Sequence, residues 1–470
     1  MNVKLIALLL VSIVAGVGIY ALLPSEPILP LIDKLIITSE DLASSSALEA
    51  YVYQHADVEL RTMAQVLSES VGVLEPEAPL MVTSIQDVSV STAHSSWEQL
   101  YLCVSPTLDA DAWTPMGYWS AGVWTVTASF FGSRYVRLMG SGMKGIVGNV
   151  VITYNSGSQL TVNLDKECLS YNWGRWYVTV TGKIQYRSQD AWKLYNFIWS
   201  KNPKYVMFFG TVAKVPMFWT GWIYNNMVMQ SVTDHPYSVR NVQTDNGMLY
   251  RSIPIGRIPV ASPTQVDTVI SKITSRTSAS VGRSALIRDT AVGYDYEVSK
   301  MVDALASIGS VANKVEDGTL DAALSVINSG NDIVILGGHG TSTSIACTIP
   351  MFTLGSIDLT TFSTYTVGVS YACSIADISS AESIAGKWIT TPMSKGIGFI
   401  GYNTFTDVAS LAFVTDQFIR NYRVVGFGKA IMDGLNLLEN LWAIWRNDST
   451  LKNPNHVLQR LCIQFFGCPW

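Results

Sequence analysis

Residues 332–340 read DIVILGGHG and residues 366–375 read TVGVSYACSI, and these two stretches decide the fold. Each begins as a short apolar run without polar alternation, which is typical of a strand buried on both faces of a parallel sheet. The first run leads into His339 and the second into Cys373. Because ligands bind at the carboxyl ends of parallel strands, we expect both side chains at one edge of the sheet.

The flanking segments continue the alternation of strands and helices. Ser262 followed by Pro263 marks a helix start, and apolar residues then recur on one helix face. Further apolar strands are predicted at residues 34–39, 204–210, 254–260, 284–288 and 396–401. Helices are predicted at residues 43–70, 263–276, 296–308, 319–328 and 381–389. This pattern indicates an α/β fold, a parallel sheet with helices on both faces.

Residues 86–187 differ from the flanking segments in amino-acid composition and in pattern. They are dense in Trp, Tyr, Val, Thr and Gly, and they contain short runs such as NVVIT at 149–153 and LTVNL at 160–164. These features predict an antiparallel β module inserted into the α/β domain. The domain itself would then consist of residues 34–83 and 188–470.

The amino-terminal segment is apolar. Leu5 to Leu23 carries no charge, and Lys4 precedes it. At 1.5 Å per residue this run nearly spans a bilayer core of about 30 Å, and Lys4 favours a cytoplasmic amino end. We therefore expect residues 1–24 to form a single transmembrane signal anchor, through residues 5–23, at the cell membrane with the rest of the chain outside. A cleaved signal peptide and a secreted protein are the alternative.

The composition limits the classes of partner. The chain has 470 residues, of which 48% are hydrophobic and 14% charged, and its net charge is −5. A large core is expected, and without a basic stripe nucleic acid is not an expected partner. The six cysteines could form disulfides outside the cell, but their connectivity is not readable. The sequence contains no C-x-x-C motif, so a zinc site is not expected, and no cofactor is expected either. A structural calcium ion bound by loop carboxylates remains an alternative.

His339 and Cys373 together would suit nucleophilic catalysis. A thiolate is the attacking species, and an imidazole within reach can take its proton. Glycines around His339 let the backbone approach a substrate, and the amides of Gly340 and Cys373 are candidate oxyanion-hole donors. A single His in a Gly-rich loop, or a single Cys after a buried strand, is more often structural. The pairing of the two at strand ends favours catalysis.

Several ordered blocks of this sequence resemble the gingipain family of cysteine peptidases, which are relatives of caspases. The resembling blocks are 332–340 (DIVILGGHG), 369–375 (VSYACSI), 381–401 (AESIAGKWITTPMSKGIGFIG), 205–216 (YVMFFGTVAKVP), 233–237 (TDHPY), 255–260 (IGRIPV) and 461–469 (LCIQFFGCP). The resemblance implies a caspase/gingipain-like fold and a cysteine endopeptidase that cleaves proteins or peptides through an acyl-enzyme. It makes His339 the catalytic histidine, Cys373 the nucleophile, and Gly340 a donor of an oxyanion amide. Cys468 stands where the family usually has an acidic residue, which suggests a structural cysteine, with a disulfide as one option.

Two acidic residues have weaker assignments. Asp289 follows the strand at 284–288 and is a candidate for orienting His339, with a solvated loop acid as the alternative. Asp295 resembles an acid that lines the first specificity pocket in gingipains that prefer Arg. A helix-capping Asp would explain Asp295 equally well.

Two other functions compete with a cysteine peptidase. A catalytically silent surface protein that binds partners through residues 86–187 would have the same sequence blocks but an unreactive Cys373. A serine-dependent α/β hydrolase is excluded, because no G-x-S-x-G elbow is present.

Overall fold

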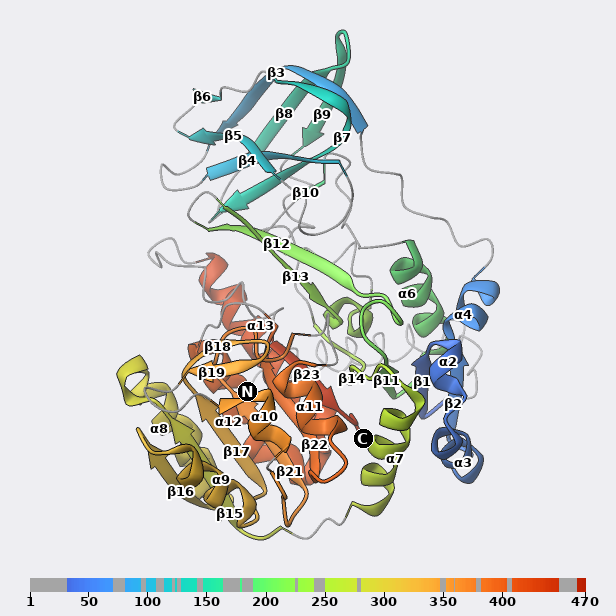
Figure 1. Cartoon of the computed structure of the whole chain (residues 1–470). Helices are drawn as coiled ribbons and strands as arrows, with labels where there is room; N and C mark the ends of the chain where they lie inside the picture. The colour runs from blue at the N-terminus through green and yellow to red at the C-terminus, as the bar shows by residue number, and fades with distance from the viewer. Residues whose placement is uncertain are drawn as a thin grey trace, which may run out of the picture.

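The computed structural model describes most of the chain in two main sheets (Figure 1). The described residues are 32–70, 81–93, 99–106, 114–120, 123–124, 128–141, 147–163, 178–179, 189–224, 227–240, 250–276, 280–346, 352–358, 360–377, 382–403, 408–447 and 463–470.

The larger sheet confirms the predicted α/β class. Among the described residues it has ten strands, and every neighbouring pair is parallel except β22 with β23. In spatial order the strands are β16 (Val311–Glu316), β15 (Arg283–Arg288), β17 (Ile333–Gly337), β21 (Thr366–Ser370), β22 (Gly396–Tyr402), β23 (Ile463–Gly467), β14 (Ile255–Ile258), β11 (Tyr205–Phe209), β1 (Lys34–Thr38) and β2 (Val58–Thr62). The central strands β17, β21 and β22 are buried throughout, which explains their unbroken apolar sequences.

Helices cover this sheet on its two faces. In Figure 1, α7 and α11 lie in front of the sheet, and α12 with α13 lies behind it. The helices are α2 (Glu40–Ala43), α3 (Ser46–Gln54), α4 (Met63–Glu69), α6 (Gln189–Lys201), α7 (Pro263–Ser275), α8 (Asp295–Ser307), α9 (Leu320–Asn328), α10 (Leu354–Asp358), α11 (Ile384–Thr390), α12 (Val408–Val425) and α13 (Phe427–Asn447).

A buried tryptophan fixes α11 against the sheet. Trp388 is fully buried, and its ring lies 4.5 Å from Phe362 and 5.6 Å from Phe399 between ring centroids. A Cβ at Gly396 would lie 2.2 Å from the carbonyl oxygen of Trp388, and one at Gly368 would lie 2.4 Å from the Phe399 ring. Neither strand position can carry a side chain, because Trp388 occupies the space at Gly396 and the Phe399 ring occupies the space at Gly368.

The second sheet is antiparallel and is built from residues 81–179. Its strand order is β6 (Val123–Trp124), β5 (Thr114–Ser120), β4 (Gln99–Ser105), β7 (Ala128–Ser141), β3 (Met81–Ala93), β8 (Val147–Tyr154) and β9 (Ser158–Asn163), with β10 (Val178–Thr179) on β7. It begins at Met81, earlier than the predicted boundary at residue 86. The predicted runs at 149–153 and 160–164 fall in β8 and β9.

A β hairpin that was not predicted extends between the two sheets. Its strands are β12 (Phe218–Tyr224) and β13 (Met227–Thr233), paired from Phe218 with Thr233 to Tyr224 with Met227. β12 contacts β7, and β13 contacts β5. Figure 1 shows the hairpin reaching from the α/β part toward the antiparallel sheet.

One predicted helix is wrong. Residues 43–70 contain parts of α2, then α3, strand β2 and α4, instead of a continuous helix. Helix α3 ends at its C-cap, His55, and the strand β2 (Val58–Thr62) then pairs in parallel with β1. Thr62 then starts α4 with a capping box to Gln65. Pairing with a distant strand therefore overrides local helical preference.

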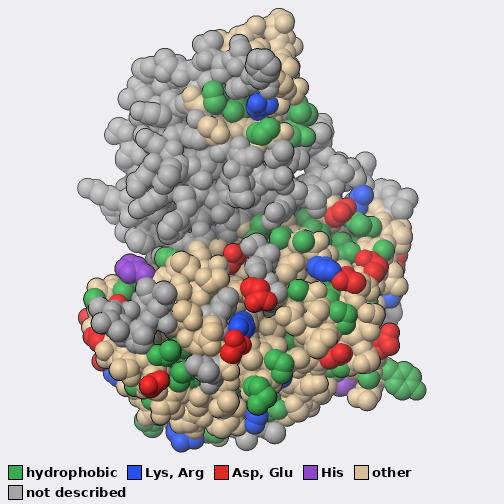
Figure 2. Space-filling view, viewed as in Figure 1, with side chains coloured by type: hydrophobic (Ala, Val, Ile, Leu, Met, Phe, Trp, Pro, Cys, Tyr) green, Lys and Arg blue, Asp and Glu red, His purple; other side chains and the backbone are tan. Residues whose placement is uncertain are grey.

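The predicted transmembrane segment, residues 5–23, lies outside the described residues. Within the part of the chain that the structure describes, no helix has the length and apolarity needed to cross a bilayer. Figure 2 shows one face of the molecule, on which acidic and basic side chains are interspersed over the α/β part without a large patch of a single charge.

Candidate active site

The two predicted catalytic loops follow neighbouring strands. β17 pairs with β21 in parallel, with Leu336 opposite Ser370, and the N–H of Tyr371 donates to the carbonyl oxygen of Leu336 at 3.1 Å. His339 opens the short strand β18 (His339–Thr341), directly after β17. The structure therefore brings the loops of His339 and Cys373 to the same carboxyl edge of the sheet.

Gly340 and Cys373 are in close backbone contact. A Cβ at Gly340 would lie 2.6 Å from the carbonyl oxygen of Cys373 and 3.0 Å from its nitrogen. The distance of 2.6 Å is shorter than real Cβ contacts, so only glycine lets the loop of His339 approach Cys373 this closely. This contact is the direct structural link between the two predicted catalytic residues.

The amino end of α11 holds both loops in place. The N–H of Ile384 donates to the carbonyl oxygen of Ser342 at 2.8 Å, and Ser342 follows β18. The N–H of the next residue, Ala385, donates to the carbonyl oxygen of Ile375 at 3.2 Å, in the turn after Cys373. Two successive amides of one helix thus fix the two loops relative to each other.

The turn after Cys373 has an unusual backbone. Ser374 has φ of +55°, in the left-handed region that non-glycine residues rarely adopt. The N–H of Ala376 donates to the carbonyl oxygen of Tyr402 at 2.8 Å, which anchors this turn on the end of β22. A sharp, anchored turn presents the preceding residue at the edge of the sheet, and sequence reasoning did not detect it.

The two side chains differ in exposure. Cys373 is a free, half-buried thiol, and His339 is exposed. Within the described residues no hydrogen bond joins His339 to Cys373 or to Asp289. The loops that carry the two residues are in backbone contact at Gly340 and Cys373, and the imidazole of His339 is exposed to solvent.

Asp289 lies at the same edge of the sheet. Its N–H donates to the carbonyl oxygen of Gly337 at 3.2 Å, so it is adjacent to the start of the His339 loop. Its side chain is 6% exposed, and Oδ1 accepts the N–H of Ala291 at 2.9 Å. This carboxylate caps the short 3₁₀ helix Thr290–Val292 and is not a solvated loop acid.

Asp295 is already paired. It is the first residue of α8, after the N-cap Tyr294, and its side chain is 77% exposed. Arg288 donates to Asp295 Oδ1 at 2.6 Å and to Glu316 Oε1 at 2.8 Å. Asp295 is therefore not the N-cap residue, and its charge is shared with an arginine at the end of β15.

The described cysteines other than Cys373 are structural. Cys468 is a free, buried thiol, so the suggested disulfide is wrong in this structure. Burial raises the pKa of Cys468 to about 11, which makes it a poor nucleophile at neutral pH. Cys103 is also buried. Cys168, Cys347 and Cys462 lie outside the described residues.

The antiparallel sheet lies beyond the same edge. Asn403, just after β22, donates through Nδ2 to the carbonyl oxygen of Val232 in β13. The β12–β13 hairpin is thus attached at the edge of the sheet where the loops of His339 and Cys373 begin, and it leads to the antiparallel sheet (Figure 1). No group of three or more His, Cys, Asp or Glu among the described residues is placed to hold a metal ion.

Comparisons with known proteins define the class. The sequence model of Peptidase family C25 matches residues 160–458, which is more than half of the chain and includes both His339 and Cys373. By this match the chain is a cysteine-type peptidase that acts on proteins or peptides. It belongs to peptidase family C25, the gingipain family. The match begins within β9, so residues 34–83, which are predicted to belong to the same α/β domain, lie outside it.

Solved structures give weaker likenesses. The Arg-specific cysteine proteinase gingipain R matches with 16% identity and a TM-score of 0.45, over 59% of this chain and 67% of that chain. The complex of Porphyromonas gingivalis RgpB pro- and mature domains matches with 16% identity and a TM-score of 0.46, over 59% and 69%. The Saccharomyces cerevisiae separase–securin complex matches with 12% identity and a TM-score of 0.30, over 46% and 14%. No curated protein matches the chain.

Proposed function

We propose that Cys373 and His339 form the catalytic dyad of an endopeptidase that works through an acyl-enzyme. The observation that carries the proposal is the backbone contact between Gly340 and Cys373 at the carboxyl edge of the sheet. A nucleophile and a base on two loops in contact are what this chemistry requires.

The proposed reaction has two steps. In the first, His339 takes the proton of the Cys373 thiol, and Sγ attacks the carbonyl carbon of the scissile bond. The C–N bond breaks, the imidazolium gives its proton to the leaving amine, and a thioester remains on Cys373. In the second, His339 takes a proton from water, and the hydroxide attacks the thioester. The carboxylic acid leaves, and the thiol regains the proton from His339.

The oxyanion of each tetrahedral intermediate would be bound by backbone amides. Gly340 and Cys373 are the proposed donors, because both lie where the two loops meet. Asp289 is proposed to act on His339 indirectly, since its N–H holds Gly337 and its carboxylate fixes the adjacent 3₁₀ helix. Loss of one oxyanion donor typically costs about 10²–10³ in kcat.

Reactivity of Cys373 tests this function against a silent, binding-only protein. An acyloxymethyl-ketone peptide probe should label wild type and should not label Cys373→Ala. Cys468→Ser is the matched control, because Cys468 is buried with a raised pKa and should not contribute. Labelling that persists in Cys373→Ala, or peptide hydrolysis unchanged by it, would overturn the dyad. A wild-type protein that is neither labelled by the probe nor active on peptides would favour the silent protein.

The remaining proposals concern organisation. We propose that the antiparallel sheet is an inserted module that contacts substrate or partners beyond the catalytic edge, because the β12–β13 hairpin joins that edge to the sheet. We also propose an exported enzyme that is anchored by residues 5–23 or secreted after their cleavage. Protease treatment of intact cells should remove the chain beyond residue 34, and full-length protected chain in the cytosol would contradict export.

A further inference from the structure

His235 forms a hydrogen bond with each of its two ring nitrogens. It opens the short 3₁₀ helix His235–Ser238, just after the hairpin strand β13. Nε of Arg251 lies 3.2 Å from Nδ1 of His235, and the carbonyl oxygen of Ile463 lies 2.8 Å from Nε2. Arginine nitrogens only donate and carbonyl oxygens only accept, so Nδ1 is the acceptor and Nε2 carries the proton. The two partners therefore require a neutral His235.

Arg251 is held in place against His235 by helix α13. The backbone N–H of Arg251 donates to Asn436 Oδ1 at 2.8 Å, and Asn436 Nδ2 donates back to the carbonyl oxygen of Arg251 at 2.9 Å. The side chain of Arg251 is 2% exposed, and its guanidinium lies 3.9 Å from the buried carboxylate of Glu439. Asn436 and Glu439 both belong to α13, so the guanidinium has little freedom to move away from the ring.

Two pairs of opposite charges surround His235 among the described residues. The first pair is Arg251 with Glu439. The second is Arg257 with Asp234, whose two carboxylate oxygens accept from the guanidinium at 2.7 and 2.8 Å. His235, both arginines and Asp234 line one cavity of about 30 Å³. The charges of these two pairs cancel as long as His235 is neutral.

A proton on Nδ1 of His235 would disturb this arrangement. It would point at the Nε–H of Arg251, so two like charges in a buried site would replace a hydrogen bond. Asp190 of α6, a helix that packs against the same 3₁₀ helix, interacts with Tyr237 and does not line the cavity. Histidines in water take up a proton at about pH 6.5, and His235 is half-buried, so the disturbance falls in moderately acidic solution.

The bond from His235 to Ile463 leads to the turn of Cys373. Ile463 is the first residue of β23, and it pairs with Tyr402, the last residue of β22. The carbonyl oxygen of Tyr402 accepts the N–H of Ala376 at 2.8 Å, and this bond anchors the turn after Cys373. Three consecutive contacts thus join the His235 ring to the backbone of the catalytic turn.

We propose that His235 is a pH-sensitive positioning residue for this turn. In its neutral form it holds the start of β23 and, through Tyr402, the turn of Cys373. When Nδ1 is protonated, Arg251 repels the ring, the bond to Ile463 is lost and the turn loosens. The expected result is a reversible loss of activity in moderately acidic solution. This loss of activity rests on the proposed dyad, whereas the change in structure does not.

Hydrogen exchange of the full chain at pH 8 and pH 5 tests the structural change. Cys373→Ala is the background throughout, so that turnover does not occur. We expect the protection of residues 371–377 and 463–467, corrected for the intrinsic exchange rates, to fall at least about ten-fold at pH 5. His235→Gln keeps a donor for Ile463 but cannot take up a proton, so its protection should fall no more than about two-fold.

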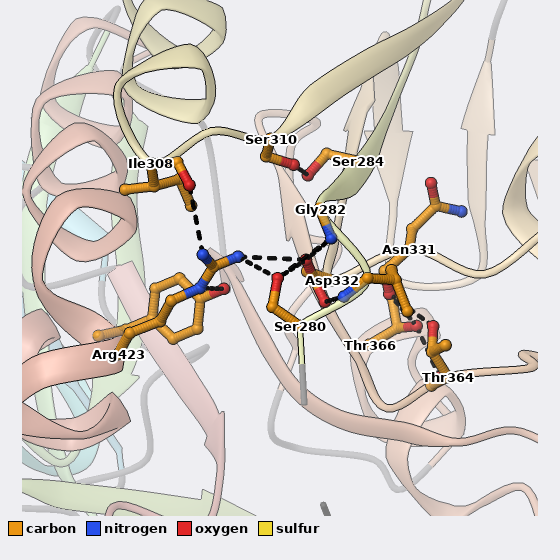
Figure 3. A network of polar contacts seen from close by, with 12 residues as sticks. Ser280, Gly282, Ser284, Ile308, Ser310, Asn331, Asp332, Thr364, Thr366 and Arg423 are labelled. Atoms are coloured by element: carbon orange, nitrogen blue, oxygen red, sulfur yellow. Dashed lines mark hydrogen bonds and ion pairs between the residues drawn. The ribbon is translucent and has the colours of Figure 1, made fainter. Parts of the chain in front are cut away.

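An internal reference lies at the other edge of the sheet. There Arg423 is paired with Asp332 at 3.2 Å and donates to the carbonyl oxygen of Ile308 at 3.3 Å, contacts that include no histidine (Figure 3). Residues 280–288 and 331–337 next to this network should keep their protection within about two-fold between pH 8 and pH 5. An equal fall in these segments would show a general loosening in acid and would overturn the proposal.

Turnover is measured separately with Cys373 intact. A catalytic histidine has a pH dependence of its own, so the comparison is between wild type and His235→Gln. The ratio of kcat at pH 5 to kcat at pH 8 should be at least about three-fold higher in His235→Gln. Equal ratios would overturn the positioning role. An inactive wild type whose protection still depends on pH would contradict the dyad and retain the structural change.

Two further results of the exchange experiment would overturn the proposal. One is equal protection of residues 371–377 and 463–467 at the two pH values in the Cys373→Ala background. The other is a fall in His235→Gln as large as in that background. If His235→Gln does not fold, His235→Asn takes its place, and the comparison with the reference segments decides without any His235 variant.

Discussion

The backbone N–H of Ile384 donates a hydrogen bond to the carbonyl oxygen of Ser342 at 2.8 Å, and this bond joins α11 to the loop of His339. The next amide, that of Ala385, holds the turn of Cys373. The relative position of the two proposed catalytic residues is therefore set by the first turn of one helix.

Removal of this single bond should reduce catalysis. Ile384 is the first residue of α11, where proline is tolerated, and the N-cap Ser383 already has the extended backbone that precedes proline. Ile384→Pro deletes the donor and keeps the helix. Because small displacements of catalytic groups are costly, we expect kcat to fall at least about ten-fold. The measurement is kcat and Tm for Ile384→Pro and for Ile384→Val.

Ile384→Val is the matched control, since it keeps the N–H and loses similar side-chain volume from a buried site. Both variants should lose some thermal stability, because each leaves a small cavity. Equal kcat in the two variants would show that the Ile384–Ser342 bond does not position the His339 loop.

A methyl group at Gly340 should separate the two catalytic loops. Gly340→Ala places Cβ 2.6 Å from the carbonyl oxygen of Cys373, so one loop must move. We expect kcat/KM to fall at least about a hundred-fold, the scale for loss of an oxyanion donor. Gly355→Ala is the control, because its Cβ meets only Thr353 Oγ1 at 3.5 Å, which is ordinary contact. Full activity of Gly340→Ala would contradict the proposed centre.

Selection of basic residues through Asp295 should be small. Its carboxylate is 77% exposed and bound to Arg288, so a substrate arginine must compete with that residue and with water. Exposed ion pairs contribute about 0–1 kcal/mol, which is up to about five-fold. We therefore expect Asp295→Asn to change the ratio of kcat/KM for matched Arg and Leu peptides by no more than about five-fold. A much larger change would make Asp295 the main specificity residue.

Lys272 should make stability depend on pH. It is 7% exposed in α7, and Nζ donates to the carbonyl oxygens of Ile389 and Thr391 at 2.5 and 2.7 Å. Burial lowers the pKa of Lys272 to about 7, whereas an unfolded lysine keeps its proton up to about 10.4. Between these values the unfolded chain binds more protons, so the free energy of unfolding should rise with pH by a few kcal/mol.

The control for this effect is Lys272→Met, of similar length and without a charge. The difference in unfolding free energy between wild type and variant should shift in favour of wild type from pH 7 to pH 10. A difference that stays constant would show that the carbonyl oxygens of Ile389 and Thr391 keep the ammonium charged in the folded protein.

The antiparallel sheet should be removable. Ser70 Oγ lies 3.5 Å from the carbonyl oxygen of Lys193, and α4 packs against α6, so the flanks of the insertion meet. Deletion of residues 71–188, with Ser70 joined to Gln189 by a short Gly/Ser linker, should give a folded core, since loop closure costs little. Circular dichroism and size-exclusion chromatography would check it. Aggregation, with no soluble core recovered, would contradict a separable module.

The central strands could be predicted because burial on both faces makes their sequence uniform. β17 and β21 are apolar throughout, and their last residues lead directly to His339 and Cys373. β16 lies at the edge of the sheet and is largely exposed, so no apolar run marks it. α12 was not predicted, although its sequence indicates a helix. Its buried residues recur at helical spacing on one face, namely Leu411, Val414, Thr415 and Phe418.

The contacts that organise the site could not be read from sequence. The pairing of Asp295 with Arg288 depends on the end of β15 reaching α8, and the bond from Ile384 to Ser342 depends on how α11 packs. Each joins segments whose relative position is set by the whole sheet. The strand ends indicate where the candidate catalytic residues lie, but tertiary packing decides what those residues contact.

The position of β23 has a consequence for biosynthesis. This strand (Ile463–Gly467) lies between β22 and β14, so it joins the half of the sheet that carries His339 and Cys373 to the half formed by β14, β11, β1 and β2. It is the last strand of the sheet to leave the ribosome, and it approaches β14 so closely that a Cβ at Gly256 would lie 2.1 Å from the carbonyl oxygen of Gly467. Each half therefore has an open inner edge during translation, a state prone to wrong pairing. The nascent chain is expected to need protection by chaperones until residue 467 has emerged.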